Sequence, residues 1–207
     1  FRIGAAYEIP EIALRAQLMY RSSTTYGAEG NLNIPAGLLG IPLPPTTLVD
    51  VAALGRGTLP QSLEMKLQSG IAPGWLAFGS VKWTDWSATT SLDVISAGSG
   101  AILSRDLYNW KDGWTVTAGV GHAFNDQVSG AVSLTWDQGV STGFDLSSDT
   151  WTLGVGGSFK DAIGGELRAG VGLTYISGAE ETRYGAANSA VDSGMAYAFS
   201  GSYKVKW

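Results

Sequence analysis

The feature that most restricts the fold of this chain is an alternation of apolar residues with small or polar ones, repeated over many segments. A β-strand points successive side chains to opposite faces, so a period of two indicates strands with one apolar face. The first such segment sets Phe1, Ile3 and Tyr7 against Arg2 and Glu8. The same pattern predicts nine strands, at about 1–9, 12–26, 59–71, 75–84, 114–120, 128–136, 151–159, 167–175 and 195–207.

The two faces of these strands differ from those of a soluble β-sandwich. The apolar face is continuous and carries aromatic side chains near the strand ends, while the other face consists of Gly, Ala, Ser and Thr with occasional charges. Aromatic residues gather at membrane interfaces, and small polar residues line a barrel lumen. The expected interface anchors are Trp75, Trp83, Trp114, Trp136, Trp151 and Trp207. We therefore predict an all-β transmembrane antiparallel β-barrel, with residues 1–207 forming a single domain.

The connections between the expected strands alternate between short and long. Short turns are expected at 10–11, 72–74, 125–127 and 162–165, and long outer loops at about 27–57, 96–111, 138–149 and 177–191. Bacterial outer-membrane barrels show this asymmetry, with short periplasmic turns and longer outer loops. The uncharged stretch 30–49 is long enough for a membrane helix, but its four prolines exclude one.

Charge and composition exclude several classes of function. A net charge of −5, with 13 basic and 18 acidic residues, disfavours a nucleic-acid partner. The absence of cysteine excludes Cys-ligated zinc, and a single histidine disfavours a multi-His metal site, so we expect neither a metal nor a cofactor. A membrane lipid hydrolase would need a base at the outer interface, but His122 lies before a short turn, so we predict a structural histidine and no enzyme. Asp85, Asp112 and Asp137 are expected as exposed acids near the outer strand ends.

An odd number of strands poses a problem of closure. A membrane sheet cannot leave an edge unpaired in lipid, and single-chain bacterial barrels have even strand counts. Either the count is wrong by one strand, or further strands precede Phe1. The chain opens in the middle of the alternating pattern, without Met or a signal peptide, so we expect it to be part of a longer protein.

Several local motifs resemble the FadL family of outer-membrane transporters for long-chain fatty acids and aromatic hydrocarbons. They are the Leu-Pro strand entry at 59–63, the Trp-x-x-Trp-Ser strand end at 82–87, the Trp-Lys-Asp strand entry at 110–114, the segment 149–156 and the C-terminal segment 203–207. The resemblance covers nearly the whole chain but only the C-terminal half of a family member. It implies a fourteen-stranded barrel with an N-terminal hatch, of which this chain would supply the last nine strands without the hatch.

The resemblance also implies a function and a set of partners. We expect passive uptake of hydrophobic molecules, such as long-chain fatty acids or aromatic hydrocarbons, across the bacterial outer membrane. The expected partners are membrane lipid and lipopolysaccharide, a hydrophobic ligand or detergent, the hatch and strands outside this sequence, and the barrel-assembly machinery, which would read Trp207. The alternative is a small structural or adhesive barrel of eight to ten strands, closed by this chain alone, with the long loops as its contact surface.

A first candidate site lies in the longest loop, where large aliphatic residues occur between prolines. These residues are Leu38, Leu39, Ile41 and Leu43. Four such side chains gain nothing from exposure to water, and the resemblance implies an external hydrophobic groove that captures ligand. The alternative interpretation is that they pack the loop onto neighbouring loops.

Cations at the alternate strand positions expected to face the lumen form the second candidate site. A ligand with an apolar tail and a carboxylate head needs an apolar pocket and one or two cations. They are Arg15, Arg21, Lys66, Lys82 and Arg168. Alternatively these cations pair with Glu8 and Glu64 and stabilise the lumen. The resemblance further implies a head-group contact for Arg105.

Overall fold

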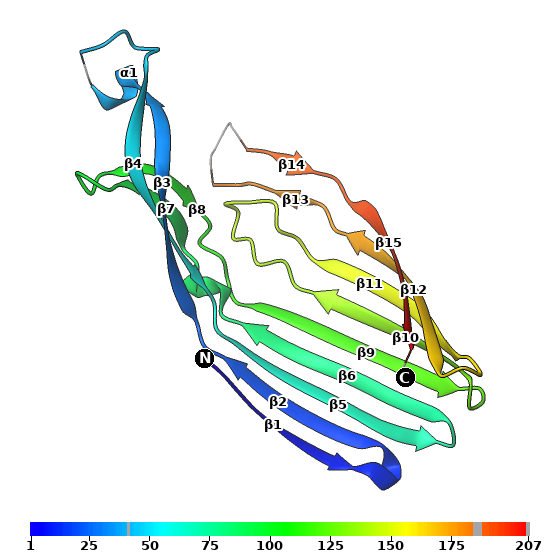
Figure 1. Cartoon of the computed structure of the whole chain (residues 1–207). Helices are drawn as coiled ribbons and strands as arrows, with labels where there is room; N and C mark the ends of the chain where they lie inside the picture. Colours follow the sequence, from blue (N-terminus) through cyan, green and yellow to red (C-terminus); the bar gives the residue numbers. More distant parts are fainter. Residues whose placement is uncertain (41, 184–187, 206–207) are drawn as a thin grey trace.

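The computed structural model describes residues 1–40, 42–183 and 188–205, and nearly half of them lie in one nine-stranded antiparallel sheet (Figure 1). The strand order is β1-β2-β5-β6-β9-β10-β11-β12-β15, so each strand pairs with the next one of this sheet along the chain. The strands are β1 (Arg2–Ile9), β2 (Leu14–Arg21), β5 (Ser62–Ala72), β6 (Trp75–Thr84), β9 (Gly113–Ala123), β10 (Val128–Asp137), β11 (Thr150–Lys160), β12 (Gly165–Ile176) and β15 (Gly194–Val205). This sheet confirms the nine predicted strands.

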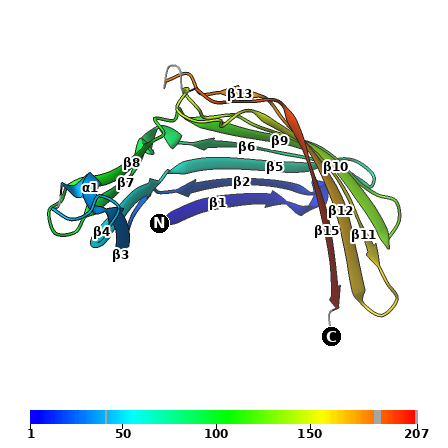
Figure 2. The same cartoon turned by 90° about the horizontal axis from the view of Figure 1, so that it is seen from above.

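The sheet is strongly curved but open, with β1 and β15 as its two edges (Figure 2). Its strands run in register over their whole length, apart from an irregularity between Gly70 and Ala72 on β5. We call the side toward which the later strands bend the concave face, and the other side the convex face. The predicted all-β antiparallel architecture is therefore confirmed, as a curved wall.

Tight turns join the strands at one end of the wall, which we call the edge with the tight turns. A 3-10 turn, η1 (Pro10–Ile12), joins β1 to β2, and the β5–β6 turn needs Gly74 at φ +74, where an added Cβ would lie 3.0 Å from the Ala123 carbonyl oxygen. In the β9–β10 turn, the Asn125 side chain accepts hydrogen bonds from the backbone N–H groups of Gln127 and Val128. All long connections leave the opposite end of the strands, which we call the edge with the long connections.

A second sheet takes up much of the expected loops at 27–57 and 96–111 and extends beyond both, which corrects their assignment as loops. Its order is β3-β4-β7-β8, with β3 (Thr24–Pro35), β4 (Leu48–Leu59), β7 (Ser91–Ser96) and β8 (Ile102–Leu107). We refer to it as the outer sheet. The strand expected at 12–26 is accordingly divided between β2 and β3. The β4–β7 pairing joins segments about forty residues apart, which a local pattern does not reveal.

The remaining elements are short. A four-residue helix, α1 (Ala36–Leu39), caps the β3–β4 hairpin, and the 3-10 turn η2 (Trp86–Ala88) follows β6. The expected loop 138–149 has no strand, whereas 177–191 contains the two-residue strands β13 (Ala179–Glu180) and β14 (Ala190–Val191). Among the described residues, no helix has the length and hydropathy to cross a bilayer.

The wall lacks an ordinary hydrophobic core. The buried apolar residues of the described chain, Ile34, Ala36, Ala53 and Val140, belong to the outer sheet and to the loops rather than to the wall. Large apolar side chains of the wall are instead exposed, including Tyr197 and Phe199 on β15. Exposed apolar surface on this scale indicates a face that lies against another apolar phase.

Candidate functional site

Every charged residue within the nine strands of the wall lies on the concave face, as the strand register shows. The cations are Arg2, Arg15, Arg21, Lys66, Lys82, Lys160, Arg168 and Lys204, and the carboxylates are Glu8, Glu64, Asp137 and Glu166. Eight cations face four carboxylates, whereas the whole chain carries a net charge of −5. The concave face is therefore basic in an acidic protein. It includes all five cations that the sequence placed on the lumen parity.

Three of these cations form ion pairs on the face itself. Arg15 contacts Glu8 at 3.1 Å across β1 and β2, Lys66 contacts Glu64 at 3.2 Å, and Arg168 contacts Glu166 at 2.9 Å. Arg15 and Lys66 thus make the pairs with Glu8 and Glu64 that the alternative interpretation expects. Exposed pairs of this kind contribute only about 0–1 kcal/mol to stability, so they orient these side chains more than they hold the sheet together.

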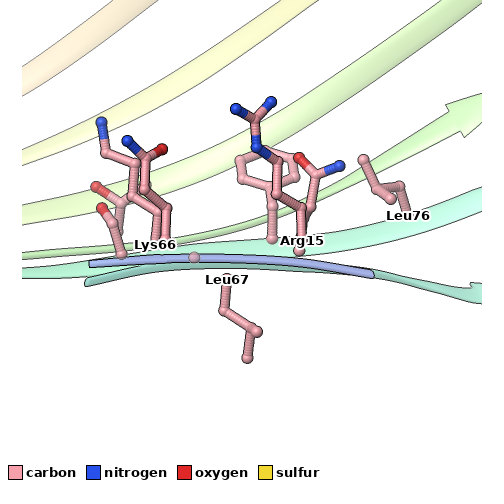
Figure 3. A pocket seen from close by; sticks show the side chains of 10 residues that line it. Arg15, Lys66, Leu67 and Leu76 are labelled. Carbon is pink, nitrogen blue, oxygen red and sulfur yellow. The ribbon is translucent and has the colours of Figure 1, made fainter. Parts of the chain in front are cut away.

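A hollow of about 360 Å³ lies beside the first two pairs on the concave face. Arg15 and Lys66 project into it from β2 and β5, whereas Leu67 points to the convex side (Figure 3). Leu76 and Phe78 of β6 supply its apolar surface. The hollow therefore combines an apolar floor with cationic side chains, as an amphiphilic ligand with an anionic head requires.

Phe78 was missed at the sequence level because its position in the alternation places it on the face expected to be polar. Its ring occupies the space above Gly119 on the neighbouring strand β9, where an added Cβ would overlap it. Glycine at 119 thus lets the ring lie flat along the sheet. The signal that could have identified it is an aromatic residue at a strand position where the other strands carry small residues, with a glycine opposite it.

The next strands present a much barer concave surface. Its middle rows are formed by Gly119, Gly121, Ala131, Ser133, Gly154, Gly156, Gly170 and Gly172. The threonine hydroxyls of this region bond to each other, with Thr117 to Thr135 at 2.9 Å and Thr152 to Thr174 at 2.8 Å. A hollow of about 400 Å³ lies over this surface and reaches Arg168. We call this region the smooth wall.

Four of the predicted anchors gather on the convex face at the edge with the long connections. Trp83 lies opposite Trp114, and Trp136 lies opposite Trp151 with ring centroids 6.1 Å apart. The Trp83 indole donates to Asp112 at 3.0 Å and the Trp136 indole to Asp149 at 3.1 Å. The predicted anchors therefore form a band, and their role in the lipid interface stays a prediction.

The fifth anchor, Trp75, lies at the edge with the tight turns. Its ring is 4.3 Å from that of His122, whose Nδ1 lies 3.1 Å from the Gly74 carbonyl oxygen. The imidazole is thus engaged with an aromatic ring and a turn. Trp207, the sixth predicted anchor, lies outside the described residues.

Loop residues fold over the concave face at the edge with the long connections and form an aromatic cap. Tyr108 stacks on Trp110 with centroids 4.5 Å apart, and Trp86 meets Trp110 edge-on at 5.1 Å. The Trp110 indole donates to Asp145. Val140 and Trp86 pack against the face at Gly113, where a Cβ would collide with Val140. These segments are far apart in the sequence, and sequence analysis missed the cap.

The three aspartates expected near the outer strand ends are all hydrogen-bonded. Asp85 accepts from Gln61 Nε2 at 2.9 Å and from Ser87 Oγ at 2.8 Å, and these bonds hold the pKa of Asp85 below its ordinary value. Asp112 accepts from Trp83, and Asp137 accepts from Thr115 Oγ1 at 3.0 Å. The described chain contains no group of three or more residues arranged to hold a metal ion.

The predicted groove residues lie at the tip of the outer sheet, far from the wall (Figure 1). Backbone bonds from Ala36 to Thr47 and from Gly37 to Pro45 fold the tip back on itself. Leu38 is 80% exposed and Leu43 is also exposed, whereas Leu39 is half-buried. Ile41 lies outside the described residues. An apolar tip is thus present, and its use as a capture groove stays a prediction.

Arg105 lies on β8 of the outer sheet, away from the hollow. Its Nε and Nη2 donate to the two carboxylate oxygens of Asp93 at 2.7 and 2.6 Å. This bidentate contact holds the pKa of Asp93 below its ordinary value and raises the pKa of Arg105. The guanidinium is therefore engaged with Asp93, and a head-group contact for Arg105 stays a prediction.

In the wall, all strand charges lie on one face and apolar side chains cover the other. This arrangement is typical of membrane barrels, in which the sheet separates a polar compartment from an apolar phase. Residues 1–129 match the family described as outer membrane protein transport protein (OMPP1/FadL/TodX). The chain belongs to this family. Membership confirms the predicted resemblance to the FadL family.

Solved structures show the same fold at low sequence identity. A FadL homologue from Pseudomonas aeruginosa matches with a TM-score of 0.76 and 14% identity, over 98% of this chain and 50% of that one. The CymD monoaromatic hydrocarbon channel matches with a TM-score of 0.59 and 12% identity, over 98% of this chain and 49% of that one. The chain thus spans about half the length of these proteins. No curated protein matches it.

Proposed function

We propose that this chain forms part of the wall of an outer-membrane channel for passive uptake of hydrophobic molecules. The observation that carries the proposal is the segregation of every strand charge onto the concave face, opposite a convex face of exposed aliphatic and aromatic side chains. Lipid would cover the convex face, and the concave face would line the lumen. Such an arrangement lets a solute pass without any covalent step.

Closure into a barrel is part of the proposal, because free strand edges are not tolerated in lipid. Further strands of the complete protein would pair with β1 and β15. Fourteen strands and a hatch would agree with the expectation from the family. The apolar tip of the outer sheet would make the first contact with a solute, and the hollow beside Leu76 and Phe78 would receive it next.

Uptake by cells tests this function. The complete protein is expressed in an outer-membrane host lacking its own transporter, and uptake of radiolabelled dodecanoate and toluene is followed. Replacing Leu38, Leu39 and Leu43 by Ser should lower the uptake rate severalfold, because the apolar contact at the tip is lost. The control variant replaces Thr24 and Thr58, polar residues at the base of the outer sheet, by Ser. Unchanged uptake in the Leu variant would remove the tip from the mechanism, and no uptake by the unmodified protein would contradict the proposed function.

A further inference from the structure

The two edges of the convex face differ in the residues that follow the aromatic side chains. At the edge with the long connections, an aspartate lies two residues beyond each of three tryptophans. They are Asp85 beyond Trp83, Asp112 beyond Trp114 and Asp149 beyond Trp151. An ionised carboxylate is costly in hydrocarbon, so these aspartates set the limit of the apolar band at this edge.

From this limit the apolar band of the convex face extends eight residues along the strands. On β6 it runs from Trp83 to Trp75, and on β11 from Trp151 to Phe159. Eight residues span about 27 Å along a strand. At the strand tilt of about 40° found in outer-membrane barrels this is about 20 Å along the membrane normal, whereas the apolar band of such barrels is about 25 Å tall. The apolar phase therefore extends about 5 Å past Trp75 and Phe159, to the level of the tight turns.

Three connections at the edge with the tight turns carry an isoleucine. Ile12 lies in η1, Ile71 lies at the end of β5, and Ile163 lies in the β11–β12 turn, and their exposed fractions are 50%, 60% and 77%. Turns ordinarily favour Gly, Pro, Asn, Asp and Ser. A hollow of about 570 Å³ lies between the first two turns, lined in part by Ile12, Ile71 and Trp75. Exposed apolar side chains gathered at one edge indicate contact with an apolar phase.

The β11–β12 turn satisfies its polar groups internally. The Asp161 carboxylate accepts a hydrogen bond from the Tyr203 hydroxyl, and others from the backbone N–H groups of Ile163 at 3.0 Å and Gly165 at 2.7 Å. Polar groups need partners within the protein where water is scarce. The turn thus combines an exposed apolar side chain with internally bonded polar groups, as insertion into a lipid layer requires.

From these observations, and building on the proposed function, we propose that the tight turns are inserted into the inner leaflet of the membrane, where Ile12, Ile71 and Ile163 contact phospholipid acyl chains. Continuity supports this occupant, because the isoleucines prolong the convex face, which carries no strand charge and lies against lipid in the proposed function. Short turns of outer-membrane barrels lie on the periplasmic side, so the leaflet is the inner one. The hollow between the first two turns would hold the end of one acyl chain.

The β9–β10 turn differs from the other three and supplies an internal control. Its residues Asn125, Asp126 and Gln127 are all polar and exposed. The Asn125 side chain bonds to the backbone of the turn, whereas Asp126 is an exposed acid. This turn would lie in the aqueous head-group layer while its neighbours reach the acyl chains.

Spin-label accessibility tests the insertion. The complete protein carries a single introduced cysteine, I163C or I71C, which is labelled with a nitroxide in vesicles of phosphatidylethanolamine and phosphatidylglycerol. Both labels should be several-fold more accessible to dissolved oxygen than to a water-soluble nickel complex, because oxygen concentrates among the acyl chains. The matched control is D126C, which places the same label on the β9–β10 turn, and this label should be more accessible to the nickel complex.

The other outcomes overturn the proposal. Nickel access at positions 163 and 71 equal to that at 126 would place the turns in water. Labels open to nickel in vesicles but shielded from it in isolated outer membranes would assign the isoleucines to a periplasmic protein partner. A preference for oxygen at 126 as well would show that the label itself selects the lipid. Because I163C and I71C lie at different turns, failure of one variant to fold leaves the other as the test.

Failure of this inference differs from failure of the proposed function, and a label at Val132 on the convex face of β10 separates the two. If the label at Val132 prefers oxygen while those at 71 and 163 prefer nickel, the convex face lies in lipid and only the insertion of the turns is wrong. If the label at Val132 prefers nickel too, the wall does not lie in lipid and the proposed function itself is wrong.

Discussion

The concave face has two unlike halves. On β1, β2, β5 and β6 it carries ion pairs, amide side chains and the Phe78 ring, whereas on β9 to β12 its middle rows are reduced to glycine, alanine and paired hydroxyls. Both halves belong to the same regular antiparallel sheet, so the difference arises from side chains and not from the backbone. The comparison teaches that groups able to hold a ligand are concentrated on the earlier strands, opposite a smooth wall that leaves room for it.

The two halves meet at Phe78 and Gly119, and a substitution there should have the largest effect. In G119V the added side chain would overlap the Phe78 ring, so the ring must leave its position or the strands must shift. We expect a loss of about 1–3 kcal/mol in stability and loss of the hollow as a binding site. The measurements are the unfolding temperature in detergent and the binding of dodecanol.

The control for this variant is G172V on the smooth wall. An added Cβ at 172 meets only the Ala198 Cβ, at 3.7 Å, which is an ordinary contact. The G172V protein should therefore unfold within about 0.5 kcal/mol of the unmodified one, as is usual for substitutions away from special sites. Equal destabilisation by both variants would contradict the distinction between the two halves.

Removing the aromatic ring alone should have the next largest effect. The F78A variant deletes most of the apolar floor of the hollow, and burial of such a side chain by a ligand is worth about 1.5–3 kcal/mol, so the affinity for dodecanol should fall at least tenfold. The matched variant is L67A, which lies on the adjacent strand but points to the convex side (Figure 3). A comparable loss in L67A would show that the tail does not lie on the concave face.

The smallest expected effect concerns the tight turn that ends the smooth wall. The Asp161 carboxylate accepts a hydrogen bond from the Tyr203 hydroxyl at 2.5 Å and others from the backbone N–H groups of Gly165 and Ile163. These bonds hold the pKa of Asp161 below its ordinary value, first through Tyr203. The stabilisation is present above the pKa of the unfolded chain and is lost as the pH falls through the lowered value of the folded protein.

Acid should therefore weaken this turn, and the variant Y203F should show a weaker dependence on pH. The readout is the unfolding temperature in detergent between pH 6 and pH 3, a window chosen to include the ordinary pKa of Asp, about 3.9. D161N should remove the same contribution, whereas E11Q, in the β1–β2 turn, should leave it unchanged. An identical pH profile for Y203F and the unmodified protein would show that the tyrosine contributes nothing to this turn.

The strands of the wall could be predicted from the sequence because the alternation in segments such as 128–136 and 151–159 is strict. The outer sheet could not be predicted in the same way. The middle of its β3 strand, Ala28 to Asn31, has no large apolar side chain on either face, and the order of the sheet depends on pairing between β4 and β7. Without a continuous row of large apolar side chains the alternation is weak, so these segments were interpreted as loops.

The candidate site shows a similar limit. Parity placed Arg15, Arg21 and Lys66 on one face, but only the register shows that Arg2 lies opposite Arg21 and that Lys66 contacts Glu64. Which cation has a partner depends on the offset between neighbouring strands, and the turn lengths alone leave that offset undetermined. Phe78 was missed because the inward parity was expected to be polar.

The central claim is that the concave face lines an aqueous lumen while the convex face lies in lipid. The chain contains no cysteine, so single cysteines can be introduced on β10 at positions 132 to 135 of the complete protein and spin-labelled in lipid vesicles. Labels at Val132 and Leu134 should be accessible to oxygen dissolved in the bilayer, and labels at Ser133 and Thr135 to a water-soluble nickel complex. Equal accessibility at all four positions, or the reverse alternation, would contradict the account.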